Sequence, residues 1–237
     1  QIDIGKKFQS ATLSVIVNKR FLIRPFTMSP NPKVVQLRQL LATRFPAARF
    51  KPEPVEEKAR NVWPTGISGV DESLNGGLLK AAITELVAGR CCGSALFISA
   101  ILRKAAAEKQ IFALVDGLDS FDPTSFNQRV LHYLLWVRCK DAAQALKATD
   151  LLLRDRNFPL VVLDLAINPV QQLRKIPSST WYRLQRIVES SGTTFVVVTP
   201  QAMVGCAQVR LRLKNRFTLD DLEDEQTRLL GRLKPEL

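Results

Sequence analysis

Residues 87–95 have the types and spacing of a phosphate-binding loop, except at three positions of the motif. Such a loop follows a strand and opens a helix, and its motif is Gly, four residues, Gly, Lys and then Ser or Thr. The glycines let backbone N–H groups surround phosphate oxygens, the Lys neutralises the β- and γ-phosphates, and the hydroxyl binds magnesium. Aligning Gly93 with the second glycine places Ala88 at the first, Ser94 at the lysine and Ala95 at the hydroxyl.

The loop therefore keeps a glycine-rich backbone but lacks its cation and its metal-binding hydroxyl. Gly89 and Gly93 still permit a backbone curl, whereas Arg90 would reach an anion from a different point of the loop. Each lost charge-assisted hydrogen bond is worth about 1.5–3 kcal/mol. Losing several weakens triphosphate binding by about a hundredfold or more. We expect no catalytic residue, no metal site and no cofactor, with ATP and magnesium relevant only if an ATP-dependent alternative holds.

Two acidic residues end apolar segments, where an acid can orient magnesium. Asp164 follows residues 160–163 and is the Walker B-like candidate, and Asp116 ends the preceding apolar run in the same way. An Asp at a strand end is as often a turn or capping residue. For the acids of residues 119–123 we favour a turn that leads into a helix.

The formal net charge of +12 favours nucleic acid, acidic proteins or anionic surfaces as neighbours, although an ordinary solvated basic surface explains it equally well. Residues 1–27 hold five cations and one acid, which gives 5 − 1 = +4, so the rest of the chain carries 12 − 4 = +8. Weak, salt-dependent DNA binding is one consequence to test. The candidate phosphate contacts are Arg174, Lys175, Arg210, Arg212 and Lys214.

The sequence gives little support for a zinc site or a membrane span. The four cysteines form no C-x-x-C pair and the chain has a single His, so a zinc site is not expected. This cysteine usage indicates reduced thiols and a cytoplasmic protein. No apolar run reaches the roughly 18 residues that span a bilayer.

Three regions are expected along the chain. Residues 1–27 form an N-terminal extension, either a non-native stretch before Met28 or a genuine arm with a short strand around residues 12–17. Residues 28–62 form a helix, with Val34, Leu37 and Leu41 on one face, and a linker. Residues 63–237 form the core domain with a C-terminal helix.

Strands and helices alternate in this core. Apolar strands are expected at residues 82–88, 111–116, 134–139, 160–165 and 194–199, and a half-exposed strand at 209–214. Helices are expected at 94–109, from Pro123, from Asp141 to about 154, at 179–189 and from Asp220 to the end. The pattern predicts an α/β fold, a doubly wound and mostly parallel sheet with helices on both faces. Ligands bind such sheets at a topological switch point, near the carboxyl ends of the strands.

Residues 63–78, Trp-Pro-Thr-Gly-Ile-Ser-Gly-Val-Asp-Glu-Ser-Leu-Asn-Gly-Gly-Leu, resemble the opening of RecA-family domains. The matching residues are Thr65, Gly66, Val70, Asp71, Leu74, Gly76, Gly77 and Leu78. Glu85, residues 115–116, residues 121–123 and residues 160–164 resemble later motifs of the family in order. The resemblance covers residues 63–213 and implies a RecA-like fold of the P-loop NTPase class.

The sequence also departs from the family pattern. Leu118 stands where the family has its catalytic Glu, and no polar sensor matches after Val198, because Thr199 and Pro200 occupy its place and Gln201 is displaced by one. The two DNA-binding loops, at residues 165–179 and 199–209, are short. With its degenerate nucleotide loop, the chain resembles the ImuA branch. That resemblance implies a non-catalytic accessory protein of the bacterial DNA damage (SOS) response and translesion synthesis, partnered by a Y-family-like polymerase subunit. The N-terminal helix and the C-terminal Leu222, Leu229 and Leu233 are the candidate partner surfaces, unless they pack on the domain.

Three alternatives stay open. The chain could be a RecA-like ATP- and DNA-binding recombination or repair protein, which micromolar ATP binding would reveal. It could be a DNA-binding module without enzymatic activity. It could also be a SulA-like cell-division inhibitor, which would bind a tubulin-like partner. A homo-oligomer is compatible with each of them.

Overall fold

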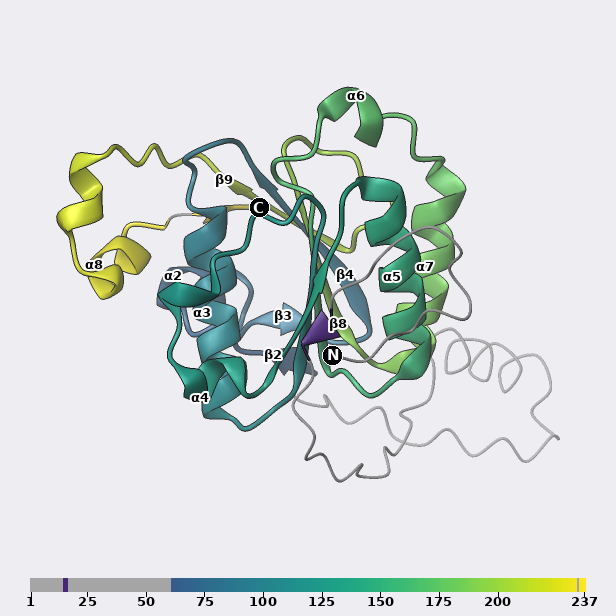
Figure 1. Ribbon diagram of the computed structural model, residues 1–237, viewed down its shortest axis with the longest axis horizontal. Coiled ribbons are helices and arrows are strands. Elements are labelled where there is room, and N and C mark those ends of the chain that lie inside the picture. Colours follow the sequence, from purple (N-terminus) through teal and green to yellow (C-terminus); the bar gives the residue numbers. More distant parts are fainter. Residues whose placement is uncertain (1–14, 17–60, 234) are drawn as a thin grey trace, which may run out of the picture.

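The most apolar segments of the chain form the centre of an eight-stranded sheet in the computed structural model, which describes residues 15–16, 61–233 and 235–237 (Figure 1). The strand order is β1-β6-β5-β7-β8-β4-β9-β10. The six strands from β6 to β9 in this order run parallel, and β1 and β10 pair antiparallel at the two edges. The strands are β1 (Val15–Ile16), β4 (Ala82–Ala88), β5 (Phe112–Asp116), β6 (Leu134–Arg138), β7 (Leu160–Asp164), β8 (Thr194–Thr199), β9 (Val209–Leu213) and β10 (Pro235–Glu236).

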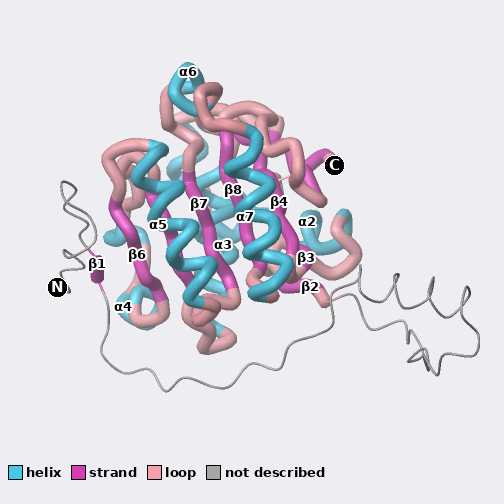
Figure 2. The backbone as a smooth tube through the Cα atoms, turned by 90° about the vertical axis from the view of Figure 1, so that its right-hand side faces the viewer, coloured by secondary structure: helices cyan, strands magenta, loops and turns pink. Residues whose placement is uncertain are grey.

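Helices cover both faces of this sheet, and Figure 2 shows α5 and α7 side by side on one of them. The opposite face carries α3 and α4 (Figure 1). A small second sheet pairs β2 (Val62–Trp63) with β3 (Leu78–Leu79). The helical segments are α2 (Ser68–Ser73), α3 (Ser94–Ala107), η1 (Pro123–Ser125), α4 (Gln128–Leu131), α5 (Ala142–Asp155), α6 (Val170–Leu173), α7 (Ser178–Ser191), η2 (Asp220–Glu223) and α8 (Gln226–Gly231).

Each face of the sheet has its own apolar core. Phe97, Ile101 and Phe112 belong to the core beneath α3, whereas Trp181 and Leu184 belong to the core beneath α7. Every residue of β4, β5 and β8 is buried. Strands that are covered on both faces need apolar residues throughout, which explains why these segments are nearly continuous apolar runs. The predicted α/β, mostly parallel, RecA-like architecture is confirmed.

The local predictions mostly agree with the structure. The bounds of β4 and β8 are those expected, and the other core strands differ by one residue at an end. Asp141 caps α5, because its carboxylate accepts a hydrogen bond from the backbone N–H of Gln144 at 2.8 Å. Pro123 opens only a 3-10 turn, which is followed by the short α4.

The single closing helix expected from Asp220 is wrong. A 3-10 turn, η2, is followed by extended backbone at Asp224 and Glu225, then by α8 and the edge strand β10. The leucines of this region do not share one face, since Leu219 is 81% exposed while Leu229 and Leu233 are buried. Tertiary packing therefore divided a segment that helical periodicity alone made continuous.

The predicted N-terminal helix and its stripe of Val34, Leu37 and Leu41 lie outside the described residues, as does most of the linker. β1 lies within the short strand that was expected around residues 12–17 for a genuine N-terminal arm, and it pairs with β6. No described helix is long and apolar enough to cross a membrane.

Candidate functional site

The loop between β4 and α3 has the backbone of an anion-binding turn. Gly93 lies at the N-cap of α3 in the left-handed region, with φ 92° and ψ 18°, and Cys91 is also left-handed, with φ 57°. The backbone N–H groups of residues 90–93 donate to no backbone carbonyl within residues 61–233. Amides that curl at the start of a helix form a concavity that suits an anion.

Two apolar side chains from the far end of the chain lie against this loop. A Cβ atom added to Gly93 would come within 2.6 Å of Leu233 Cδ2 and 2.8 Å of Phe217 Cε2. A larger residue at position 93 would force both side chains to shift, and its positive φ would be strained as well. The backbone N–H of Phe217 also donates to the carbonyl oxygen of Cys91 at 2.9 Å. We call residues 215–233 the cover segment, because they pack directly on the loop.

Polar contacts hold the cover segment in place. Gln226 Nε2 donates to Ser99 Oγ of α3 at 2.7 Å, and Asn215 Nδ2 donates to the carbonyl oxygen of Arg232 at 2.7 Å. The Arg232 guanidinium lies 5.3 Å from the centroid of the Phe217 ring and also pairs with Asp221. The pKa of Asp221 is lowered to about 2, mainly by the backbone N–H of Thr218 and then by Arg232. The segment is thus tied both to α3 and to itself.

These residues do not fit a magnesium-bound nucleoside triphosphate. The lysine position holds the partly buried Ser94 and the hydroxyl position holds the exposed Ala95. Arg90 is exposed on the loop. Phe217 and Leu233 offer no charge or hydrogen bond beside Gly93. Among the described residues, no cluster of three or more His, Cys, Asp or Glu side chains could hold a metal ion.

Asp116 and Asp164 face each other as register partners at the carboxyl ends of β5 and β7. Asp116 is 1% exposed. It accepts four hydrogen bonds, from the backbone N–H groups of Leu118 and Phe121, the Ser120 hydroxyl and the Trp136 indole. Asp164 accepts one from the backbone N–H of Ala166 at 2.9 Å. The pKa of Asp164 is raised to about 6, mainly by burial and also by the negative charge of Asp116, although the hydrogen bond from Ala166 opposes this rise.

The turns after these two strands are tied together by Asn168, which the sequence did not single out. Its Nδ2 donates to the carbonyl oxygen of Gly117 at 3.2 Å, and the backbone N–H of Gly117 donates to the carbonyl oxygen of Asp164 at 2.9 Å. A Cβ atom at Gly117 would lie 2.7 Å from that same oxygen and would also overlap Asn168. The two acids therefore lie among closely packed turns at the ends of β5 and β7. In the sheet, β8 lies between β7 and β4, the strand that leads into the loop.

Glu85 forms a second buried polar centre, within β4. Its fully buried carboxylate accepts hydrogen bonds from the Thr199 hydroxyl at 3.0 Å and from the backbone N–H groups of Met203 and Val204 at 2.8 and 3.0 Å. Arg210 completes it, with Nε 2.7 Å from Glu85 Oε2. A carboxylate in the middle of an apolar strand needs such partners, so the sequence signal was present. The connection from β8 to β9 is thereby fixed to β4.

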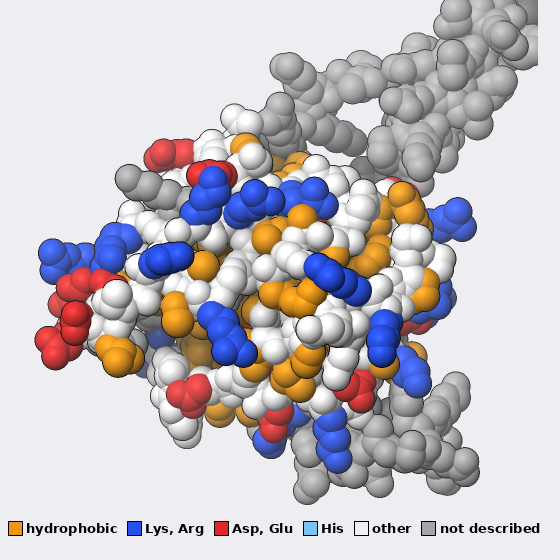
Figure 3. All heavy atoms as spheres, turned by 90° about the horizontal axis from the view of Figure 1, so that it is seen from above, with side chains coloured by type: hydrophobic (Ala, Val, Ile, Leu, Met, Phe, Trp, Pro, Cys, Tyr) orange, Lys and Arg blue, Asp and Glu red, His pale blue; other side chains and the backbone are white. Residues whose placement is uncertain are grey.

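The residues predicted to contact DNA phosphate divide into two groups. Arg210 is engaged by Glu85 and by the carbonyl oxygen of Val204, and Lys214 pairs with Glu236 at 2.5 Å. Arg174, Lys175 and Arg212 are exposed and have no ion pair with another described residue. Arg174 and Lys175 follow α6, at the carboxyl edge of the sheet. Figure 3 views the molecule from that side and shows Lys and Arg side chains over much of the face.

The opening motif has a structural role. The carboxylate of Asp71 accepts hydrogen bonds from the backbone N–H groups of Thr65 and Gly66 at 2.8 and 3.1 Å, and from the Thr65 hydroxyl at 2.7 Å. These bonds fix the turn between β2 and α2. These residues of the opening motif therefore stabilise the first turn of the domain and do not line the loop after β4.

The sheet order, with a phosphate-type loop after an interior strand and helices on both faces, defines a RecA-like α/β fold. The crystal structure of the RadB recombinase is similar to this chain, with a TM-score of 0.50 and 17% sequence identity over 62% of this chain and 81% of that chain. At this identity the likeness shows the fold alone. No family model and no curated protein matches the chain.

Proposed function

We propose that the chain is a non-catalytic, RecA-fold accessory protein of the bacterial DNA damage response, similar to the ImuA branch. The observation that carries this proposal is the loop after β4. It retains the backbone curl, has Ser94 and Ala95 in place of the lysine and the hydroxyl, and packs against Phe217 and Leu233. An ATPase needs a cation and a metal anchor at this loop. A fold that has exchanged them for an apolar contact is suited to serve as a scaffold.

In the ImuA-like role, the partner is a Y-family-like polymerase subunit that acts in translesion synthesis. This part of the proposal is supported by the ordered motifs of residues 63–164 and by the degenerate loop. The decisive experiment is affinity capture of the tagged full chain from DNA-damaged cells of the source organism. Recovery of a Y-family-like polymerase supports the role. Recovery of a tubulin-like division protein would replace it with the SulA-like alternative.

The loss of nucleotide binding can be tested by restoring the missing groups. Calorimetric titration of Mg-ATP is expected to show no saturable micromolar binding to the wild-type chain, nor to the Ser94→Lys/Ala95→Thr variant. Adding Phe217→Ala and Leu233→Ala to that variant removes the apolar cover and is expected to give measurable binding. Micromolar binding by the wild-type chain would contradict the proposal and would favour the ATP-dependent alternative.

The exposed basic residues at the carboxyl edge favour one second candidate function, binding of nucleic acid. Affinity for single-stranded DNA is expected to fall steeply with salt, because phosphate contacts release counterions. Arg174→Glu/Lys175→Glu should weaken such binding, whereas Lys214→Glu, at a residue already paired with Glu236, should weaken it less. Binding that is absent or insensitive to salt would remove this candidate.

A further inference from the structure

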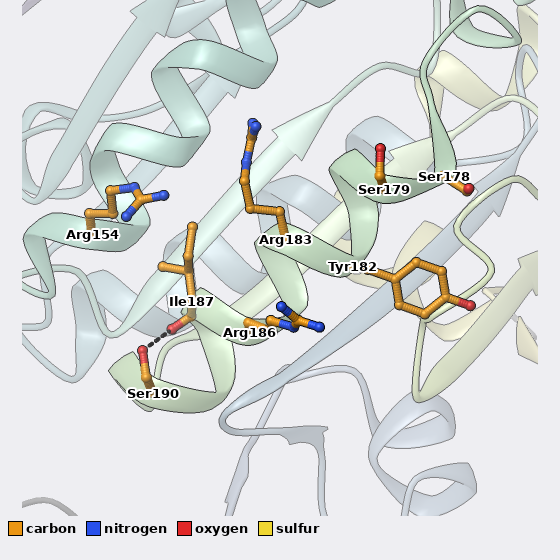
Figure 4. A pocket seen from close by; sticks show the side chains of 8 residues that line it. All are labelled: Arg154, Ser178, Ser179, Tyr182, Arg183, Arg186, Ile187 and Ser190. Carbon is orange, nitrogen blue, oxygen red and sulfur yellow. Dashed lines mark hydrogen bonds between the residues drawn. The ribbon is translucent and has the colours of Figure 1, made fainter.

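Two oppositely charged surfaces lie at opposite ends of the molecule. The first is a shallow groove of about 620 Å³ on the outer side of α7, beside the end of α5 (Figure 4). Its charged walls are Arg154, Arg183 and Arg186, and its apolar part includes Tyr182 and Ile187. We call it the arginine groove. The second surface is the start of the cover segment, which lies with α8 at the far end of the domain from α7 (Figure 1).

The arginine groove has an excess of positive charge. Asp150 accepts hydrogen bonds from Arg154 Nε at 2.7 Å and lies 3.2 Å from Arg183 Nε, so one carboxylate serves two guanidinium groups. Arg186 is exposed and has no ion pair with another described residue. Glu189, the next acid on α7, accepts a hydrogen bond from Gln185. Tyr182 is 53% exposed, so an apolar surface lies next to uncompensated positive charge.

The start of the cover segment has the opposite character. Residues 219–225 read Leu-Asp-Asp-Leu-Glu-Asp-Glu, with five carboxylates in seven residues. Asp221 and Asp224 are engaged by Arg232 and Arg228. The carboxylates of residues 220, 223 and 225 are exposed and have no ion pair with another described residue. Leu219, which precedes them, is 81% exposed.

We propose that residues 219–225 of one copy of this chain dock in the arginine groove of a second copy. The free carboxylates then face Arg183 and Arg186, and Leu219 packs against Tyr182 and Ile187. Contacts between two different surfaces are heterologous, and surfaces at opposite ends of a molecule do not close on themselves in a dimer. Assembly is therefore head-to-tail, and it continues past the dimer into a ring or a filament. This inference is independent of the proposed function.

The contact is expected to be weak and sensitive to salt, because exposed ion pairs are screened at high ionic strength. Sedimentation velocity of the wild-type chain tests it, from micromolar to near-millimolar concentration. In about 50 mM NaCl the average mass should rise with concentration beyond that of a dimer, and in about 500 mM NaCl it should return toward one chain. A wild-type chain that stays monomeric throughout at low salt overturns the proposal.

Two variants then identify the surfaces. Arg183→Glu/Arg186→Glu blocks the groove, and Leu219→Ser/Asp220→Asn/Glu223→Gln blocks the acidic segment. Each alone should be monomeric. Mixed, they should form a dimer and nothing larger, because each retains one working surface. Arg129→Glu, an exposed charge reversal on α4, should assemble like wild type, and thermal melts check that all variants are folded. Assembly of either blocked variant alone, or no dimer in the mixture, contradicts the proposal.

Discussion

The loop after β4 and the strand ends of β5 and β7 lie at the same edge of the sheet, but they differ from the nucleotide-site pattern in opposite ways. The loop keeps its backbone and lacks the reactive side chains, and Phe217 and Leu233 now pack beside Gly93. The strand ends keep their acids, Asp116 and Asp164, and use them in the hydrogen bonds and packing of the turns that follow. A residue type at a family-like position therefore need not carry the chemistry that the family resemblance implies.

This difference has an energetic basis. A glycine turn costs little to keep, since it needs only the backbone and a neighbour that leaves it room. A buried carboxylate must be satisfied or it destabilises the fold. Asp116 meets this condition with four donors, whereas Asp164 accepts one hydrogen bond, from Ala166, and has a raised pKa. The two acids are thus expected to affect stability with opposite sign at neutral pH.

The largest expected effect is that of Asp116→Leu. Four donors lose their acceptor, and each buried unsatisfied group costs about 1–3 kcal/mol. We expect the free energy of unfolding to fall by about 3–5 kcal/mol, measured by urea denaturation with tryptophan fluorescence. Asp122→Ala is the matched control, because Asp122 caps the exposed η1 turn, and its cost should be much smaller than that of Asp116→Leu. Similar losses for both variants would show that Asp116 is no structural centre.

The next effect concerns the cover segment. In Phe217→Ala/Leu233→Ala the loop loses its apolar neighbours, and truncating the buried Leu233 alone should cost about 2–4 kcal/mol of local stability. Hydrogen exchange should become faster in residues 89–94 and 215–233 and stay unchanged in α7. Leu219→Ala, at a side chain that is 81% exposed, is the control and should leave exchange as it is. Unchanged protection in the double variant would mean that the cover segment does not depend on this contact.

The smallest effect is a gain in stability from Asp164→Asn. The folded pKa of about 6 lies above the ordinary value of 3.8. The native state therefore binds more protons than the unfolded state between these values, and stability falls as pH rises from about 4 to 6. Asn keeps an acceptor for Ala166 and does not ionise. The variant should be about 1–3 kcal/mol more stable than wild type at pH 7.5 and equal to it near pH 4. Parallel stability curves across this range would exclude the raised pKa.

Much of the fold could be predicted because its signals are local. The apolar runs at residues 82–88 and 194–199 gave strands with their observed bounds, and Asp141 gave the start of α5. The C-terminal segment was predicted as one helix because leucine spacing says nothing about which surface a segment will meet. The sequence indicated Glu85 only as part of a family-like motif. Its hydrogen-bond partners could not be predicted, because they lie more than a hundred residues away along the chain.

The sequence by itself determined that the loop after β4 has no lysine and no metal-binding hydroxyl, since the residue types at positions 94 and 95 decide that wherever the loop lies. It also determined the order of strands and helices, because propensity and periodicity act along the chain. Only the tertiary structure decided that Phe217 and Leu233 pack against Gly93 and that Arg210 is paired with Glu85. Contacts between distant segments depend on how whole layers pack, and no local pattern encodes that packing.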